Sequence, residues 1–542
     1  FGIKTDKFNH QISNNISKIN KKINLKLSVV NYLLNPFNFT IKIKTNSPQI
    51  VLEDRNLDIS RIKTNIALKN LINGQFSIVN LEIATNEIKL NDVIKLTRAF
   101  QNSPQLFILD SIIKDGHIIA NINLNFDEQR KLKDNYKIEG IIKKGNLDIL
   151  NQFKLNDLNF KFNIEKNIYL LNQIEAKINN IKIASPLIKI KKNKEFFSVS
   201  GKILNEKKNF DDKKLKLIFP NLLKDLDIKK IELSSKNDFS FNISNNFKLD
   251  NLKTKSTVNL NQLIINKKDL NLIKTYLPSF VEEIKLEKHE IVIKYNKNKF
   301  DISGEGNILL EDKSDNLSYQ ILKDKVNLAF DTKVYLKNNS LLLNFLNYEK
   351  KANIDSLIQI KGNLKKNNRL KFELINLKEM NNEISIKGLN LNKDFKILDI
   401  ENLNLSYKNN KNIINNINLK KKGLNFIIEG DSFDASKMID NIMDNNEKKS
   451  SIFYNLNSKI NINIKKTYID KTNYLDNLNG NIDFRNNKID KLKLESSSSN
   501  DKKINLSVET KKNLETITKL SSNYPKPLIE RYDFIKGFED GY

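Results

Sequence analysis

The stretch "LNFKFNI", Leu158 to Ile164, alternates apolar and polar residues along its whole length. Successive side chains of an extended chain point to opposite sides, so the period of two predicts a strand with one apolar and one polar face. The apolar face of this strand carries Leu158, Phe160, Phe162 and Ile164.

The same alternation recurs throughout the chain. It returns as "IKIK" at Ile41 to Lys44, "LIKIK" at Leu187 to Lys191, "INLK" at Ile417 to Lys420 and "KININIK" at Lys459 to Lys465. From about residue 105 to residue 430 the sequence predicts strand after strand, separated by polar turns such as "KKG" at 143–145 and "KNN" at 337–339. The predicted fold class is mostly β.

A few segments have the apolar spacings of three and four that are typical of short amphipathic helices. The first contains Phe8, Ile12, Ile16 and Ile19, with Thr5 or Asp6 as N-cap. Further helices are expected in "NDVIKLTRAF" with Asn91 as N-cap, at Phe219–Ile228, at Lys267–Ile284 and in "DASKMIDNIMD" behind Asp434. Between the first two helices, residues 47–90 predict several short strands, with a turn at Asn73-Gly74.

The composition excludes several classes of protein. The 542 residues include 8 Pro, 15 Gly, 30 Phe and no Cys, which argues against collagen-like chains, disulfide frameworks and wholesale disorder. The net charge of +28 would suit a nucleic acid. Lys is scattered beside Asn along nearly every predicted strand, however, so a biased Lys/Asn/Ile composition explains the charge more simply, and we do not expect nucleic acid as a partner.

No residues with the spacing of a known catalytic or metal site are found in the sequence. His10, His117 and His289 lie far apart, and none has a neighbour at metal-ligand spacing. We find no Gly-rich phosphate loop, nucleophile elbow or HExxH motif. The sequence therefore predicts no catalytic residue, no metal site, no cofactor and no enzymatic activity, and it contains no run of about 18 apolar residues that would predict a transmembrane helix.

The apolar face of such a sheet must be covered. One alternative is a second sheet, as in a β-sandwich, and this would suit a β-rich structural or adhesive protein. The other is an elongated antiparallel sheet that curls into a lengthwise apolar groove, whose floor is covered by lipid acyl chains. Burial of each methylene would then contribute about 0.8 kcal/mol.

Several segments carry a resemblance to a known family. They are "FGIKTDKFNHQISNNISKIN" at the start, residues 47–93, "IEGDSFDASKMIDNIMD" with Gly430, Asp434, Ala435 and Ser436, and "YPKPLIERYDFIKGFEDG" near the end. These segments resemble the AsmA-like family, in particular its large YhdP-type branch. The chain departs from that branch at Phe219-Pro220, where relatives often carry Trp-Pro.

The resemblance implies three parts and a function. Residues 1–104 would form an N-terminal helix-plus-strand module, residues 105–430 an extended repetitive β-groove region, and residues 431–542 a C-terminal module that continues beyond Tyr542. The family implies a periplasmic protein of a Gram-negative bacterium, held in the inner membrane by an anchor ahead of Phe1. It would move phospholipid towards the outer membrane and support outer-membrane integrity, with outer-membrane components as further partners.

The hypothesis of an apolar groove predicts which residues contact lipid. The candidates are Leu158, Phe160, Phe162, Ile164, Ile188, Ile190, Phe239, Phe241, Ile460, Ile462 and Ile464. Lys161 and Lys189 lie on the opposite face of their strands and are expected to face solvent.

Overall fold

The structure is a computed structural model. It describes residues 2–532 except 20, 54, 73–76, 101–102, 130, 150–152, 211–215, 217–226, 247, 267–282, 311–312, 366–368, 444–452, 498–501 and 512–515. Contacts divide the chain into two compact units. Unit 1 holds residues 1–208, 234–257 and 295–297, and unit 2 holds residues 209–233, 258–294 and 298–542.

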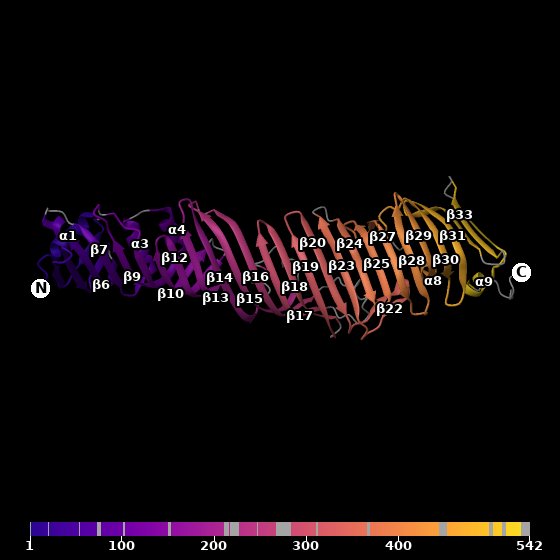
Figure 1. The fold of residues 1–542 in the computed structure, drawn as a ribbon, viewed down its shortest axis with the longest axis horizontal. Helices are drawn as coiled ribbons and strands as arrows, with labels where there is room; N and C mark the ends of the chain where they lie inside the picture. Colours follow the sequence, from indigo (N-terminus) through magenta and orange to yellow (C-terminus); the bar gives the residue numbers. More distant parts are fainter. Residues whose placement is uncertain are drawn as a thin grey trace. The chain divides into compact units, whose positions relative to one another are not determined.

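Unit 1 is built from antiparallel strands that follow one another across a sheet (Figure 1). The pairing runs β1, β3, β4, β6, β7, β9, β10, β11, β12, β13 and β14, and a side branch pairs β2 with β5 and β5 with β6. The bounds are β1 Gly2–Thr5, β2 Ile23–Lys26, β3 Val30–Asn35, β4 Thr40–Asn46, β5 Gln49–Leu52, β6 Arg55–Ala67, β7 Ile78–Thr85, β8 Ile88–Lys89, β9 Ile113–Asn125, β10 Lys137–Ile149, β11 Phe153–Glu165, β12 Ile168–Ile178, β13 Ile181–Lys192 and β14 Phe196–Asn209.

Unit 2 is also built from strands that follow one another across a sheet, from β18 to β34. Four strands have residues in both units: β14, whose last residue Asn209 belongs to unit 2, β15 Asp227–Ser244, β16 Leu249–Asn266 and β17 Glu283–Asn296. The others are β18 Lys299–Leu310, β19 Lys313–Lys323, β20 Asn327–Leu336, β21 Leu341–Leu343, β22 Tyr348–Lys350, β23 Ser356–Lys365, β24 Leu370–Glu379, β25 Asn382–Leu391, β26 Ile397–Asp399, β27 Asn402–Lys408, β28 Ile414–Lys422, β29 Asn425–Asp434, β30 Ser458–Tyr468, β31 Tyr474–Arg485, β32 Lys488–Ser497, β33 Lys503–Thr510 and β34 Thr516–Ser522.

The prediction of a mostly β fold is confirmed, but the sheet is mixed rather than purely antiparallel. Strands β29 and β30 pair in parallel, with Ile428 opposite Ile462. Parallel neighbours need a long crossover, and the chain between these strands contains helix α8, Ser436–Met443. The alternation within each strand is the same for parallel and antiparallel pairs, so the sequence pattern did not distinguish them.

The predicted helices have mixed outcomes. Helices α1 (Asn9–Ile19), α3 (Leu90–Phe100) and α8 are confirmed, but two predicted N-caps are wrong: Thr5 and Asp6 lie at least three residues ahead of Asn9, and Asn91 lies inside the first turn of α3. The predicted helices at Phe219–Ile228 and Lys267–Ile284 lie outside the described residues, except for their last two residues, which begin β15 and β17. The Asn73-Gly74 turn also lies outside the described residues.

Two helices stand where strands were predicted. Helix α4, Pro104–Ile112, begins with Ser103 as N-cap and Pro104 in its first turn, which is the usual chemistry of a helix start. Helix α2, Leu68–Ile72, follows β6 directly. The remaining described helix, α9 (Lys526–Tyr532), lies in the segment "YPKPLIERYDF".

The segment Lys143–Gly145, predicted to be a turn, is instead a bulge inside β10. Lys144 has a φ of 49°, and the pairing of β10 with β9 and β11 shifts register at this point. The bulge inserts one extra residue into β10, so Ile142 and Gly145 lie on the same face although they are three residues apart. The apolar face of β10 therefore continues across the bulge. The predicted turn at 337–339 is confirmed.

Irregular positions recur in neighbouring strands of unit 1. Asp157 in β11 and Gln173 in β12 each have a φ of 52°, and β13 carries Pro186 where its pairing with β14 shifts register. In β11 and β12 the spacing of the apolar residues increases to three across the irregular position, from Leu155 to Leu158 and from Leu171 to Ile174. A bulge bends its strand, so we expect a local bend at each of these positions.

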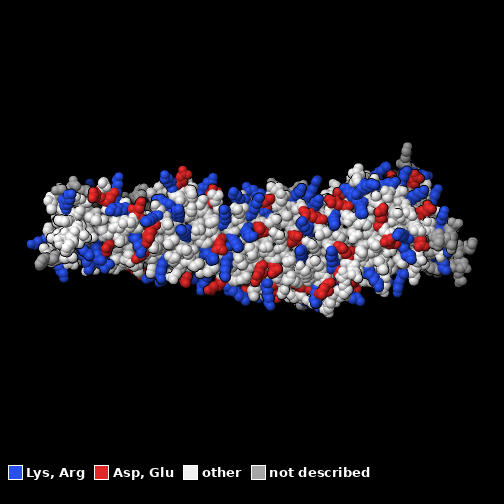
Figure 2. Space-filling model, in the orientation of Figure 1, with Lys and Arg blue, Asp and Glu red and all other residues white. Residues whose placement is uncertain are grey.

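The two faces of the sheet differ in chemistry. The polar face carries Asn and Lys with cross-strand ion pairs such as Lys361 with Glu373 at 3.0 Å and Lys378 with Glu383 at 3.4 Å. Figure 2 shows Lys and Arg dispersed over the visible surface, interspersed with Asp and Glu, rather than gathered in one stripe. The part of the apolar face near β6 to β9 is covered by helix α3 and forms a core with Leu57, Ile59 and Ile88.

Candidate functional site: the apolar face of the sheet

In unit 1 the predicted groove residues of β11 and β13 lie on one face. Phe162 is opposite Gly140 of β10 and Leu171 of β12, and Leu171 is opposite Ile188 of β13. Ile164 is likewise connected through Tyr169 to Ile190. The side chains of Leu158, Phe160, Ile164, Ile188 and Ile190 are half-buried, while Lys161 and Lys189 on the other face are exposed, as predicted.

Aromatic rings on this face lie over cross-strand glycines. The ring of Phe162, which is 8% exposed, comes within 2.7 Å of the position that a Cβ of Gly140 would occupy. Phe239 lies over Gly201 in the same way, at 3.0 Å, and stacks on Phe241 with ring centroids 5.9 Å apart. Any side chain on these glycines would displace the rings, so the glycines let the aromatic groups lie flat on the sheet.

In unit 2 the predicted residues Ile460, Ile462 and Ile464 of β30 also share one face. Following the partners of Ile462 across the sheet gives a continuous line of apolar side chains from β23 to β30, all half-buried. This line, called the open row, consists of Ile360, Ile375, Ile386, Leu403, Leu419, Ile428 and Ile462.

Two residues further along each strand lies a second line, called the closed row. It consists of Leu377, Ile384, Leu405, Ile417 and Ile464, which are 2% to 8% exposed. Gly430 continues it between Ile417 and Ile464, and there a Cβ would lie 2.2 Å from the carbonyl oxygen of Asn416.

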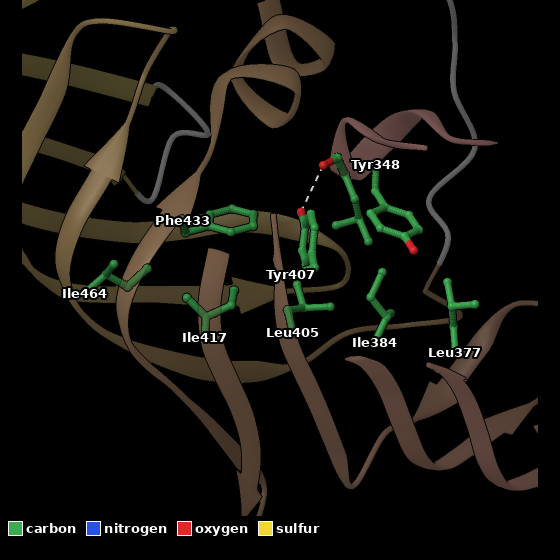
Figure 3. Packing of buried hydrophobic residues seen from close by; sticks show 9 residues of the cluster. Tyr348, Leu377, Ile384, Leu405, Tyr407, Ile417, Phe433 and Ile464 are labelled. Atoms are coloured by element: carbon green, nitrogen blue, oxygen red, sulfur yellow. Dashed lines mark hydrogen bonds between the residues drawn. The ribbon is translucent and has the colours of Figure 1, made fainter. Parts of the chain in front are cut away.

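A short excursion of the chain covers the closed row. The 3-10 helix η1 (Asn344–Leu346) and β22 place Leu346 and Tyr348 on it. Figure 3 shows Tyr348 and Tyr407 above Leu405 and Ile384. Their rings meet edge to face with centroids 5.5 Å apart, and the Tyr407 hydroxyl donates a hydrogen bond of 2.9 Å to the carbonyl of Leu346. Burial raises the pKa of both tyrosines.

A buried polar network fastens this cover. Asp434, which is 4% exposed, accepts hydrogen bonds from the Asn409 and Asn347 side chains at 2.8 and 3.0 Å and from the Ser436 backbone at 3.0 Å. The Lys411 ammonium lies 3.4 Å from the same carboxylate. The Asp434, Ala435, Ser436 pattern noted in the sequence thus joins the cover to the start of α8.

A second set of buried polar groups holds the chain that leads into the cover. Asp315 accepts hydrogen bonds of 2.8 Å from the backbone of both Lys337 and Asn338. Lys350 is fully buried, and its ammonium donates to the carbonyls of Lys337 and Asn339 at 2.8 and 2.7 Å. Burial lowers the pKa of Lys350. This role cannot be predicted from the sequence, because Lys350 has the same kind of sequence neighbours as the other lysines of the chain.

His289 lies on the same apolar face in β17. It is 1% exposed, its Nε2 lies 2.9 Å from the Asn307 carbonyl, and its ring is 5.9 Å from that of Tyr319. Burial lowers the pKa of His289 and raises the pKa of Tyr319 to about 12. These contacts give His289 a packing role.

The described residues contain no cluster of His, Asp and Glu side chains that could hold a metal ion. None of the described helices has the length and hydrophobicity that crossing a membrane requires. Comparisons of the chain with protein-family models and with curated proteins give no match. The AsmA-like resemblance, the three-part organisation and the lipid contacts of the predicted residues therefore stay predictions.

Proposed function

We propose that this protein is a periplasmic conduit that binds phospholipid acyl chains on the apolar face of its sheet and moves them along a groove between the inner and outer membranes. In this proposal the tails lie on the open row of unit 2 and on the half-buried residues of β10 to β13 in unit 1. The headgroups stay in water, and the protein binds and releases lipid without any chemical turnover.

The open row is the observation that carries the proposal. Seven apolar side chains from neighbouring strands are aligned in register, yet each remains partly accessible to solvent. A continuous apolar surface exposed to water is unfavourable and is typical of a binding site. Acyl chains match it, because they are apolar, flexible and long enough to contact several strands.

The bulges in unit 1 support a groove. Lys144, Asp157 and Gln173 are irregular positions of three neighbouring strands, and repeated bulges curve a sheet. The AsmA-like resemblance supports the cellular setting: inner-membrane attachment, a periplasmic location and a contribution to outer-membrane integrity.

The test uses two half-buried residues of β11. Phe162 is unsuitable because it is buried against Gly140, and an aspartate there would disturb folding in any case. The double variant Phe160→Asp/Ile164→Asp places two charges where the tails would lie. A matched control, Lys161→Asp, changes the net charge by the same amount on the opposite face of the same strand.

Each protein carries a photo-crosslinking residue at Leu171, opposite Phe162, and is incubated with radiolabelled phospholipid in detergent. We expect Lys161→Asp to crosslink like the parent protein and the double variant to lose at least 90% of the crosslinks while its circular dichroism is unchanged. A folded double variant that crosslinks as well as the control would refute lipid binding on this face.

The closed row favours a second candidate, a β-rich structural or adhesive envelope protein whose apolar face is covered by its own chain. That candidate predicts no crosslink to lipid in the parent protein. It also predicts that protein purified from an envelope fraction contains no co-isolated phospholipid by mass spectrometry.

A further inference from the structure

The part of unit 1 around β1, β3 and β4 exposes an unusual group of large apolar side chains. We call this group the apolar tip; its members are Ile3, Leu33, Leu34, Phe37, Phe39 and Ile72, and they are 45% to 93% exposed. Phe37, at 93%, is almost completely in solvent. Burial within unit 1 therefore does not account for these residues.

The backbone brings these residues together at one end of a hairpin. Phe37 and Phe39 stand in the turn between β3 and β4, and the Asn35 side chain accepts a hydrogen bond from the Phe37 backbone at 3.2 Å. The Leu68 backbone donates a hydrogen bond of 2.8 Å to the Phe39 carbonyl. This bond holds the start of α2 beside the turn, and α2 ends at Ile72.

The neighbouring edge strand extends the patch. Gly2 of β1 is opposite Leu33, and Ile3 is opposite Tyr32. Tyr32 and Ile3 belong to the apolar face of the sheet, since Tyr32 is also opposite Ile43 of β4. The tip is therefore continuous with the beginning of the apolar face in unit 1.

The charge of the segment that carries most of the tip is predominantly positive. Residues 1–52 contain eight lysines and one acidic residue, Asp6, and residues 28–52 contain no acidic residue at all. Lys42 is exposed opposite Leu33, and Lys69 is exposed in α2. In Figure 2, uncharged side chains are grouped near the N-terminus with Lys and Arg around them.

We infer that the apolar tip docks on the surface of an anionic phospholipid bilayer, with Phe37 and Phe39 inserted among the acyl chains and the surrounding lysines on the headgroups. Aromatic and aliphatic side chains surrounded by basic residues bind such interfaces through buried apolar area together with attraction to anionic lipid. A folded protein partner would need a complementary acidic, concave surface, whereas a bilayer accepts a protruding hairpin turn without one.

Docking of the apolar tip is independent of the lipid groove, because it uses different residues and a different form of the lipid. It needs an intact bilayer, while the groove proposal needs only single phospholipid molecules. The two proposals can therefore fail separately.

The absence of Trp from the chain allows a direct test. In Phe37→Trp the only tryptophan lies at the centre of the tip. We expect its emission to shift to shorter wavelength on addition of vesicles of phosphatidylglycerol and phosphatidylcholine, and to be quenched by brominated acyl chains. Phe395→Trp is the matched control, since Phe395 also lies in the connection between two strands, β25 and β26, and is 72% exposed, but it lies between Asp394 and Lys396. Its emission should not change.

A second variant measures affinity. Phe37→Asp/Phe39→Asp should weaken vesicle co-sedimentation at least tenfold, whereas Phe395→Asp should not, and binding of the parent protein should weaken with added salt. The inference would be overturned if the Phe37→Trp protein sedimented with vesicles without a change in its tryptophan emission. It would also be overturned if the double variant sedimented as well as the parent protein. The double variant should retain the Leu171 crosslink to phospholipid in detergent, and the Phe160→Asp/Ile164→Asp protein should retain vesicle docking.

Discussion

The open and closed rows of unit 2 lie on the same strands, two residues apart, and yet differ in burial. On β27, Leu403 belongs to the open row and is half-buried, while Leu405 belongs to the closed row and is 2% exposed. The two have the same residue type, the same strand and equivalent cross-strand partners. The difference comes from the excursion through η1 and β22, which covers one row and leaves the other accessible.

This comparison teaches that alternation alone does not make a core. The strands supply an apolar face everywhere, and a short segment elsewhere in the chain decides which part of it becomes protein interior. The rest of the face is available to another apolar partner, and this is the basis of the proposed function.

The largest effect is expected from one aspartate placed in each row. Leu405→Asp would bury an unpaired carboxylate among Leu377, Ile384 and Tyr407, so we expect a loss of several kcal/mol of unfolding free energy. Leu403→Asp should cost far less, because its side chain can reach water. Urea denaturation followed by circular dichroism measures both variants, and equal destabilisation would show that the rows do not differ.

A smaller effect is expected when the cover is loosened. In Asp434→Asn an amide replaces the carboxylate that accepts from Asn347, Asn409 and Ser436, so at least one buried donor loses its partner. We expect a loss of about 1–3 kcal/mol. Hydrogen exchange should rise at the backbone of Leu346 and Tyr348; unchanged exchange there would mean that Asp434 does not fasten the cover.

The pH dependence of stability should report whether water reaches the apolar face at His289 in β17. Burial lowers the pKa of His289 below its ordinary value of 6.5, so the unfolded chain binds this proton more readily than the folded protein does. The stability that depends on neutral His289 is thus complete above pH 6.5 and is lost as pH falls from there towards the lowered pKa, by at most about 1.4 kcal/mol per pH unit.

His289→Gln keeps a donor for the Asn307 carbonyl but does not titrate. Thermal unfolding of the parent and of this variant should therefore diverge below pH 6.5, with the variant less sensitive to acid. Parallel pH profiles would show that His289 is hydrated, and that this part of the face resembles the open row.

The smallest effect is expected on the polar face. Lys378 neighbours Leu377 of the closed row along β24, but its ammonium is exposed and lies 3.4 Å from Glu383. Lys378→Gln should change the unfolding free energy by no more than about 0.5 kcal/mol in urea denaturation. A large loss would mean that the polar face, too, is part of a packed interface.

Much of the fold could be predicted from alternation, and the exceptions have physical reasons. The face shared by Leu158, Phe160, Phe162 and Ile164 follows from a period of two, and α8 follows from apolar spacings of three and four. The bulge at Lys144 differs from the predicted turn, and the sequence contains a signal for it: the spacing on the apolar face increases once to three, from Ile142 to Gly145, and alternation then resumes.

Other features depend on residues that are distant in sequence. The burial of Leu405 depends on Leu346 and Tyr348, and the parallel pairing of Ile428 with Ile462 depends on the crossover through α8. Nothing in the strands themselves encodes either contact. The candidate site was therefore predicted as a face, while its division into rows was not.

The fastening of the cover also bears on the order in which unit 2 folds. Most strand pairs join neighbours in the chain and need only short loops, but the bond from Tyr407 to Leu346 spans 61 residues and that from Asn347 to Asp434 spans 87. The entropy of closing such loops has to be offset before these contacts contribute, which makes them slow to form. We therefore expect hairpins such as β18–β19 and β23–β24 to form first and the closed row to desolvate last, leaving a folding intermediate whose entire apolar face is briefly as accessible as the open row.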